Sequence, residues 1–187
     1  MKKLTLSIIA VLGMSFGALA QADTKTDNHT ITITIPEVAL LDIELAGASK
    51  NISTTFTAPT EAGLPITGPT TGLNTLWLNY SSIVESAGAD MSRTVTVSAT
   101  SLVPGTVLNV SAGTPVVAGG SGGTVSAITA ITGAPQNIIT GVGSVYTGDG
   151  VGAGSNITYT LTAPPAFYGS LIAGATPVTV TYTLTDN

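Results

Sequence analysis

The chain has no cysteine, one histidine and one tryptophan among its 187 residues. The lack of cysteine excludes disulfides, thiolate metal sites, cysteine nucleophiles and a lipid-modified N-terminal cysteine. Charged residues are also scarce, at 8%, yet 43% of the residues are hydrophobic. Because that is enough apolar material for a core, the composition excludes a charge-rich disordered chain. Threonine, with 32 residues, and glycine, with 22, are abundant while helix formers are rare, which is typical of an all-β protein.

The first 22 residues differ from the rest of the chain. Lys2 and Lys3 precede an apolar run over residues 4–20, which ends in two overlapping small-X-small sites at 18–20 and 20–22. This order of basic, apolar and cleavage regions predicts a signal peptide over residues 1–22, with the mature protein beginning at Asp23. An uncleaved membrane anchor is the alternative, but the run is shorter than the roughly 20 residues that span a bilayer. We expect a secreted protein, periplasmic or extracellular.

Charge limits the partners that the mature chain could bind. Cleavage after Ala22 leaves three basic residues and all ten acidic ones, a net charge of −7. So few cations cannot neutralise a row of phosphates, so we expect neither nucleic acid nor an anionic membrane surface as a partner. Residues 181–187 include no apolar tail, and we expect no membrane insertion there.

Short runs of alternating hydrophobic and hydroxyl residues fill most of the remaining chain. They predict half-buried strands in residues 30–35, 76–80, 94–98, 157–161 and 178–184. Residues 38–45 fit both a helical and an alternating pattern, and we predict a strand there. Glycine, proline and serine clusters predict turns in residues 58–72, 104–105, 118–123, 141–154 and 163–165.

Strands at this spacing predict a sandwich or a barrel. A membrane barrel would need girdles of aromatic residues, and only 5% of the chain is aromatic. A solenoid would show a fixed repeat, and the chain has none. The sequence therefore predicts an N-terminal extension over residues 23–36 and one immunoglobulin-like β-sandwich, without a disulfide, over residues 37–187.

No group of residues indicates catalysis, a cofactor or a metal ion. His29 lies near the predicted mature N-terminus, where converging ligands or an orienting acid would be hard to supply. Asp42 and Glu44 alternate with apolar residues, which predicts a solvent-exposed strand face rather than a catalytic pair. The glycine-rich run 148–154 lacks the Lys-Ser/Thr ending of a phosphate-binding loop and the helix that should follow it. We expect that the protein is not an enzyme, with no catalytic, cofactor-binding or metal-binding residue.

The most distinctive segment is the N-terminal extension. A polar lead over residues 23–29 precedes the alternating segment Thr30–Ile35, and Pro36, which has no backbone N–H to donate, separates it from residues 38–45. This arrangement resembles the alpha-class chaperone-usher pilins, the colonisation-factor fimbrial subunits. Those subunits also lack cysteine and open with an alternating Ile/Val/Thr segment, a proline and a run like Val38–Gly47. The resemblance does not extend to residues 113–154.

The resemblance implies a sandwich that lacks its last strand and is completed by the N-terminal strand of a neighbouring subunit. Ile31, Ile33 and Ile35 would then be the subunit-interface residues of the donor strand, and the intervening threonines would point away. It also implies a homopolymer that forms a fimbria-like surface filament for adhesion or biofilm formation. A periplasmic chaperone and an outer-membrane usher would be its assembly partners.

A different class of function fits the same residues. In this alternative the protein is a monomeric secreted β-sandwich binding module, a carbohydrate or surface adhesin, and residues 30–35 form an ordinary edge strand of a complete sandwich. The single tryptophan and the scattered phenylalanines argue against it, because such modules are expected to cluster exposed aromatic side chains.

Overall fold

The structure, a computed structural model, describes residues 25–69, 73–88, 90–127 and 129–187. Its contacts divide the chain into two units between Thr34 and Ile35. The described part of the first unit, residues 25–34, contains no helix or strand and has exposed side chains. The predicted signal peptide over residues 1–22 and the predicted mature start at Asp23 lie outside the described residues. No helix in the described ranges is long and apolar enough to cross a membrane.

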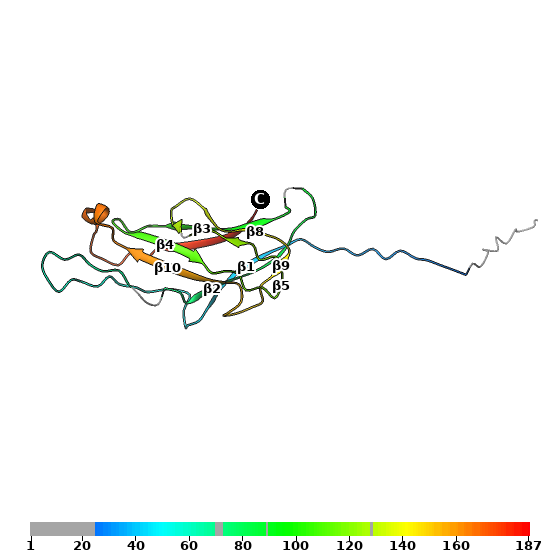
Figure 1. Cartoon of the computed structure of the whole chain (residues 1–187), viewed down its shortest axis with the longest axis horizontal. Coiled ribbons are helices and arrows are strands. Elements are labelled where there is room, and N and C mark those ends of the chain that lie inside the picture. The colour runs from blue at the N-terminus through cyan, green and yellow to red at the C-terminus, as the bar shows by residue number, and fades with distance from the viewer. Residues whose placement is uncertain (1–24, 70–72, 89, 128) are drawn as a thin grey trace, which may run out of the picture. The chain divides into compact units, whose positions relative to one another are not determined.

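The second unit is almost entirely β (Figure 1). Its elements are β1 Val38–Leu45, β2 Leu76–Ile83, β3 Arg93–Thr100, β4 Val107–Ala112, β5 Gly119–Gly120, β6 Thr124–Val125, β7 Thr129–Ala130, β8 Gln136–Val142, β9 Val145–Tyr146, β10 Ser155–Thr162, the 3-10 helix η1 Pro165–Ser170, and β11 Thr179–Asp186.

These strands form two antiparallel sheets. The first has seven strands, in the order β5-β9-β2-β10-β4-β7, with β1 also paired to β2. Because β1 pairs along the whole of β2, β9 and β10 share the opposite edge of β2. The second sheet has four strands, in the order β11-β3-β8-β6. The prediction of an all-β protein is confirmed, and its two sheets form the layers of a sandwich.

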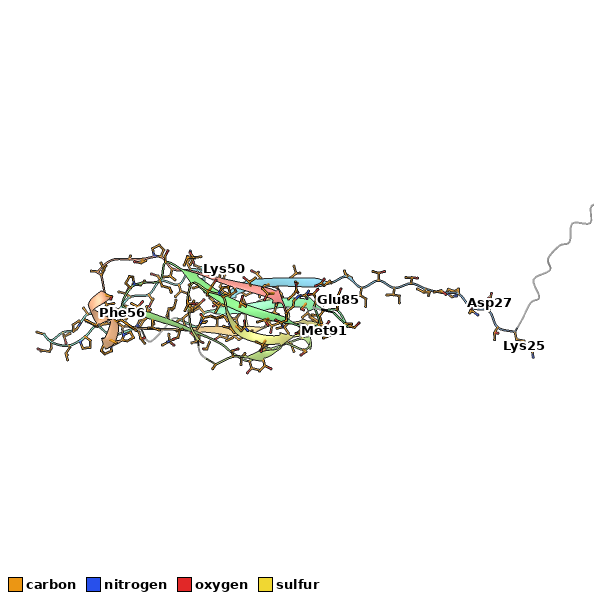
Figure 2. The ribbon with its side chains drawn as sticks, turned by 90° about the horizontal axis from the view of Figure 1, so that it is seen from above. Lys25, Asp27, Lys50, Phe56, Glu85 and Met91 are labelled. Carbon is orange, nitrogen blue, oxygen red and sulfur yellow. The ribbon has the colours of Figure 1, made fainter. Side chains whose placement is uncertain are left out.

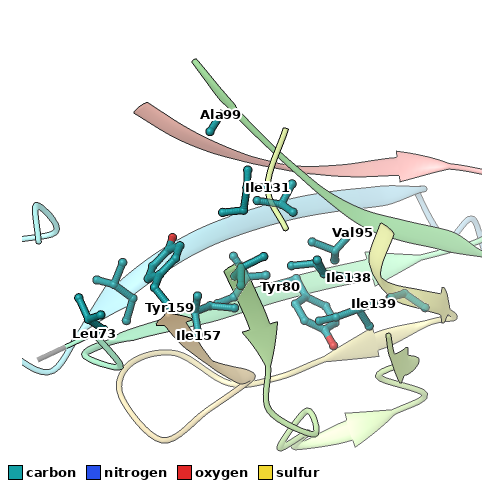
Figure 3. Packing of buried hydrophobic residues seen from close by; sticks show 14 of the residues in the cluster. Leu73, Tyr80, Val95, Ala99, Ile131, Ile138, Ile139, Ile157 and Tyr159 are labelled. Atoms are coloured by element: carbon teal, nitrogen blue, oxygen red, sulfur yellow. The ribbon is translucent and has the colours of Figure 1, made fainter. Parts of the chain in front are cut away.

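The core lies between the two sheets (Figure 3). Leu76, Leu78 and Tyr80 of β2 are 5%, 0% and 2% exposed, and Val95 and Val97 of β3 are fully buried. These are the faces that the alternating patterns predict. The strand predicted over residues 38–45 is also confirmed, because β1 pairs with β2 over its full length.

Three local predictions differ from the structure. The segment Thr30–Ile35 does not form a strand, and among the described residues no strand pairs with it. The predicted turns over residues 118–123 and 141–154 contain β5 and β9, which pair with each other. Gly119 permits that pairing, since a Cβ there would lie 2.7 Å from the Tyr146 ring.

Strand β8 has no counterpart among the predicted strands. Its neighbouring residues Ile138 and Ile139 are both buried, so its hydrophobic residues do not alternate. The β3–β8 ladder contains two register shifts, between Arg93 and Val95 and between Val95 and Thr96. A bulge of this kind breaks the period of two on which strand prediction depends.

The two ends of the sandwich carry different segments (Figure 2). Glu85 and Met91, in the connection between β2 and β3, lie at one end, and Phe56 lies at the other. The first of these ends is where β2 ends and β3 begins, and it contains the buried arginine described below.

Candidate functional site: the side between β1 and β11

Strands β1 and β11 flank one side of the sandwich, which we call the β1–β11 side. Within the described residues, β1 pairs only with β2, and β11 pairs only with β3. Cα atoms of β1 and β11 approach within 8 Å of each other. The two sheets thus each present an edge strand on this side, and an edge strand offers backbone groups for pairing.

The inward faces of both edge strands are incompletely buried. Six hydrophobic side chains pack against the core but are only half-buried: Leu41, Ile43 and Leu45 of β1, and Val180, Tyr182 and Leu184 of β11. Their ladder partners on β2 and β3 are at most 5% exposed. The core is therefore fully buried along β2 and β3 and only partly covered along β1 and β11.

A tyrosine pair crosses between the sheets close to this side. The hydroxyls of Tyr159 in β10 and Tyr182 in β11 are 2.6 Å apart and share a hydrogen bond. Burial raises the pKa of the Tyr182 hydroxyl, and the neighbouring Tyr159 raises it further. Burial also raises the pKa of Tyr159. Both phenols are therefore neutral at physiological pH and link the two sheets.

A buried arginine joins β1 and β11 at one end of this side. Arg93, at the start of β3, is 1% exposed. Its Nη1 donates to the Val38 carbonyl at 2.6 Å, and its Nε donates to the Asp186 carboxylate at 2.7 Å. Its Nη2 donates to the Glu37 carboxylate, and Nη1 also donates to Ser82 and Ile83 at the end of β2. Paired and multiply hydrogen-bonded, the guanidinium holds together the start of β1 and the end of β11.

These contacts also fix the strand directions. Arg93 contacts the first residue of β1 and the last residue of β11, so β1 begins and β11 ends at the same end of the sandwich. The two strands therefore run in opposite directions along the β1–β11 side. Sequence reasoning missed this role of Arg93. The one sequence signal is that the single arginine of the chain begins an alternating apolar strand, and this does not identify its partners.

The predicted interface residues are largely exposed. Ile31, Ile33 and Ile35 expose 72%, 81% and 71% of their surface. Isoleucine is among the residue types most often buried in proteins, so a row of three exposed isoleucines at alternate positions is unusual. Their assignment as the donor strand of an interface stays a prediction.

The acidic residues of β1 lie on its outer face. The Asp42 carboxylate pairs with Lys50 Nζ at 3.1 Å, and this contact holds the pKa of Asp42 below its usual value. Partial desolvation raises the pKa of Glu44, and the nearby Asp149 charge adds to this effect. His29 is exposed. Within the part of the chain that the structure describes, no three histidine, aspartate or glutamate side chains could together hold a metal ion.

The glycine-rich run 148–154 is confirmed as a loop and lies against β2. The Asn79 amide of β2 donates to the Gly150 carbonyl at 3.0 Å. Gly154 has φ +66°, and a Cβ there would lie 2.0 Å from the Leu78 carbonyl oxygen. Close backbone packing thus accounts for glycine at this position.

Comparison with protein-family models, with curated proteins and with solved structures finds no match for this chain.

Proposed function

We propose that the protein is a secreted structural subunit that polymerises by strand donation. The alternating segment Thr30–Ile35 of one copy would bind along the β1–β11 side of the next copy, completing an immunoglobulin-like sandwich. The observation that carries this proposal is the incomplete coverage of the core along β1 and β11, where six inward-facing hydrophobic residues are only half-buried.

The physical chemistry favours this pairing from both partners. The chain presents an alternating row of exposed isoleucines, and the sandwich presents two edge strands with an incompletely covered core. An added strand satisfies backbone donors and acceptors while its alternate side chains enter the core. Each isoleucine that becomes fully buried contributes about 1.5–3 kcal/mol.

The cellular setting follows from the predicted signal peptide. We infer export to the periplasm, where a chaperone would cover the β1–β11 side before assembly, and an outer-membrane usher would order the subunits. The product would be a homopolymeric, fimbria-like filament on the cell surface that supports adhesion or biofilm formation.

One observation favours the monomeric binding module. Four threonines of β11 are exposed on its outer face, and three of them pair with hydroxyl residues of β3 that are not fully buried: Thr179 with Thr100, Thr181 with Ser98, and Thr183 with Thr96. Such a double row of hydroxyls could hydrogen-bond to a carbohydrate or another hydroxylated surface. This alternative requires that the monomer be the stable form.

Size-exclusion chromatography and electron microscopy of Ile33→Asp test the proposal. An aspartate in the apolar core would cost at least a few kcal/mol per junction, so we expect no filaments from this variant. The matched control is Thr32→Asp, which places the same charge on the outward face and should leave filaments intact.

Strand complementation provides a second readout. A chain that lacks residues 23–35 should not polymerise, but a peptide spanning His29–Ile35 should bind it and raise its melting temperature. A wild-type protein that stays monomeric under all conditions, with a melt independent of concentration, would contradict the proposal and support the binding module.

A further inference from the structure

The first sheet carries a hollow of about 470 Å³ between β1, β2 and the glycine-rich loop 148–154. We propose that this hollow binds a calcium ion through the carboxylates of Asp42 and Asp149 and the side-chain oxygen of Asn79. The proposal does not depend on strand donation, since the isoleucines of the extension do not line the hollow.

Two of the three side chains are neighbours across a strand pair. Asp42 of β1 lies directly opposite Asn79 of β2 in the antiparallel ladder, so the two side chains share one face of the sheet. On either side of Asn79, Leu78 and Tyr80 are buried in the core. Because successive side chains of a strand point to opposite faces, Asn79 and Asp42 belong to the outer face.

Loop 148–154 supplies the third side chain. The backbone N–H of Thr147, just before the loop, donates to a β2 carbonyl at 3.1 Å. The Asn79 amide nitrogen donates to the Gly150 carbonyl at 3.0 Å. Asp149 lies between these two contacts and lines the hollow. The loop is therefore held over β2 in a position that brings the Asp149 carboxylate to the outer face.

Asn79 provides the observation that points to a ligand. The residue is only 5% exposed, and its Oδ1 is buried without a hydrogen-bond partner. Such an unpaired oxygen is costly, and buried polar groups in native proteins are normally satisfied. The amide nitrogen is already bonded to Gly150, so the oxygen is the atom that remains for a bound ion or water.

The oxygen donors around the hollow are those that calcium prefers. Calcium takes 6 to 8 oxygens from carboxylates, amides, backbone carbonyls and water. Gly148 also lines the hollow, and a glycine can do so only with its backbone. The volume leaves room for several waters at roughly 30 Å³ each. Two carboxylates disfavour an anion in the same place.

The site should be a weak one. Among the described residues, no three acidic side chains converge enough to hold a metal ion, so amide and backbone oxygens and water must complete the shell. Calcium sites of extracellular modules have dissociation constants of about 0.1–1 mM. The inference departs from the expectation of no metal-binding residue, because Asp42 and Asp149 come from distant parts of the sequence.

Lys50 competes with the proposed ion. Its Nζ contacts Asp42 Oδ1 at 3.1 Å, and both side chains are more than half exposed. An exposed pair of this kind is weak, so calcium can displace the ammonium group. Removing Lys50 should therefore strengthen calcium binding.

Calorimetric titration of calcium chloride into the mature protein, first freed of metal with a chelator, measures the site directly. We expect one ion per chain with a dissociation constant of about 0.1–1 mM. At ten times that concentration the melting temperature should rise by about 3–6 °C. Magnesium chloride at the same concentration should raise it clearly less, because magnesium demands a stricter geometry.

Four variants locate the ion. Asp149→Asn keeps the size of the side chain and should weaken calcium binding at least about tenfold. Glu61→Gln, in an exposed loop outside the hollow, is the control for the lost charge and should bind calcium like the wild type. Lys50→Ala should bind calcium up to about fivefold more tightly. Asn79→Ala should lose most of the calcium-induced rise in melting temperature, whatever its stability without calcium.

Three results would overturn the inference. If calcium up to about 10 mM gives neither heat of binding nor a change in melting temperature, Asn79 Oδ1 binds only water. If calcium and magnesium raise the melting temperature equally, cations merely screen the acidic surface. If Asp149→Asn binds calcium as tightly as Glu61→Gln does, any bound ion lies outside this hollow.

Discussion

Strands β1 and β2 pair along their whole length, yet their inward-facing residues are buried to different degrees. Leu76 and Leu78 of β2 are 5% and 0% exposed, whereas the residues opposite them, Leu45 and Ile43 of β1, are only half-buried. The same contrast separates β3 from β11 in the second sheet. Side-chain chemistry does not explain the difference, because all four strands alternate in a similar way. The difference is that, among the residues that the structure describes, β2 and β3 have neighbouring strands on both edges and β1 and β11 have one on a single edge.

An alternating strand pattern therefore specifies which face turns inward, but not whether that face becomes fully covered. Coverage depends on a strand beyond the edge. In this molecule the missing coverage lies between two strands that Arg93 holds together at one end. The end that Arg93 fixes and the open side that it adjoins should respond differently to substitution.

A large effect on stability should come from Arg93→Met, which removes the side chain that joins the start of β1 to the end of β11. Removing one partner of a buried ion pair costs about 3–5 kcal/mol when a buried charge is left behind. The Glu37 and Asp186 side chains are 46% and 54% exposed, so water can solvate them, and we expect a loss near the lower end of that range. Urea unfolding would measure it.

The control for this prediction is Lys50→Ala, which breaks the surface pair with Asp42. Both side chains of that pair are more than half exposed, so the expected change is about 0–1 kcal/mol. If Arg93→Met and Lys50→Ala lower the free energy of unfolding by the same amount, Arg93 does not fix this end of the sandwich.

Paired leucines sharpen the contrast between the closed and the open side. Leu76→Ala should destabilise the domain by about 2–5 kcal/mol, because it leaves a cavity in a closed core. Leu45 lies directly opposite Leu76 on β1. In an Ile33→Asp background, which keeps the protein monomeric, Leu45→Ala should lower the free energy of unfolding by clearly less than Leu76→Ala does. In filaments Leu45→Ala should destabilise the domain more than it does in the monomer, because a donated strand would cover that position. Equal losses in the monomer would mean that the β1 side is already closed.

The sequence was sufficient for part of this structure. Alternation in residues 76–80 and 94–98 identified two central strands and their buried faces, because both strands follow the period of two. It failed for β8, where the register shifts in its ladder with β3 place Ile138 and Ile139 together in the core. It also failed for β5 and β9, whose pairing depends on glycine and on residues distant in sequence.

The candidate site was predictable only in part. The alternating isoleucines before Pro36 are visible in the sequence, but the open core opposite β1 depends on which strands end at the sheet edges. Arg93 lies 56 residues from Glu37 and 93 residues from Asp186, so only the folded topology brings these groups together. Local patterns carry no information about contacts of that range.

The smallest effect, on the link between the two sheets, should come from Tyr182→Phe. It removes the hydroxyl that shares a hydrogen bond with Tyr159, and the loss of one such bond costs about 1 kcal/mol at neutral pH. The Tyr159 hydroxyl then loses this partner. Thr181→Val, on the outer face of the same strand, is the control and should change stability by less than about 0.5 kcal/mol.

The same variant has a pH signature with a defined sign. In the unfolded chain tyrosine titrates near pH 10. Burial raises the pKa of Tyr80 to about 12 and raises those of Tyr159 and Tyr182. The stability associated with these neutral phenols is therefore fully present below pH 10 and declines as the pH rises above it, because the unfolded state then releases protons that the folded state retains. Tyr182→Phe removes one such proton, so its unfolding free energy should fall less steeply between pH 10 and 12. Parallel pH profiles for the two proteins would show that Tyr182 titrates normally in the folded state and is not buried between the sheets.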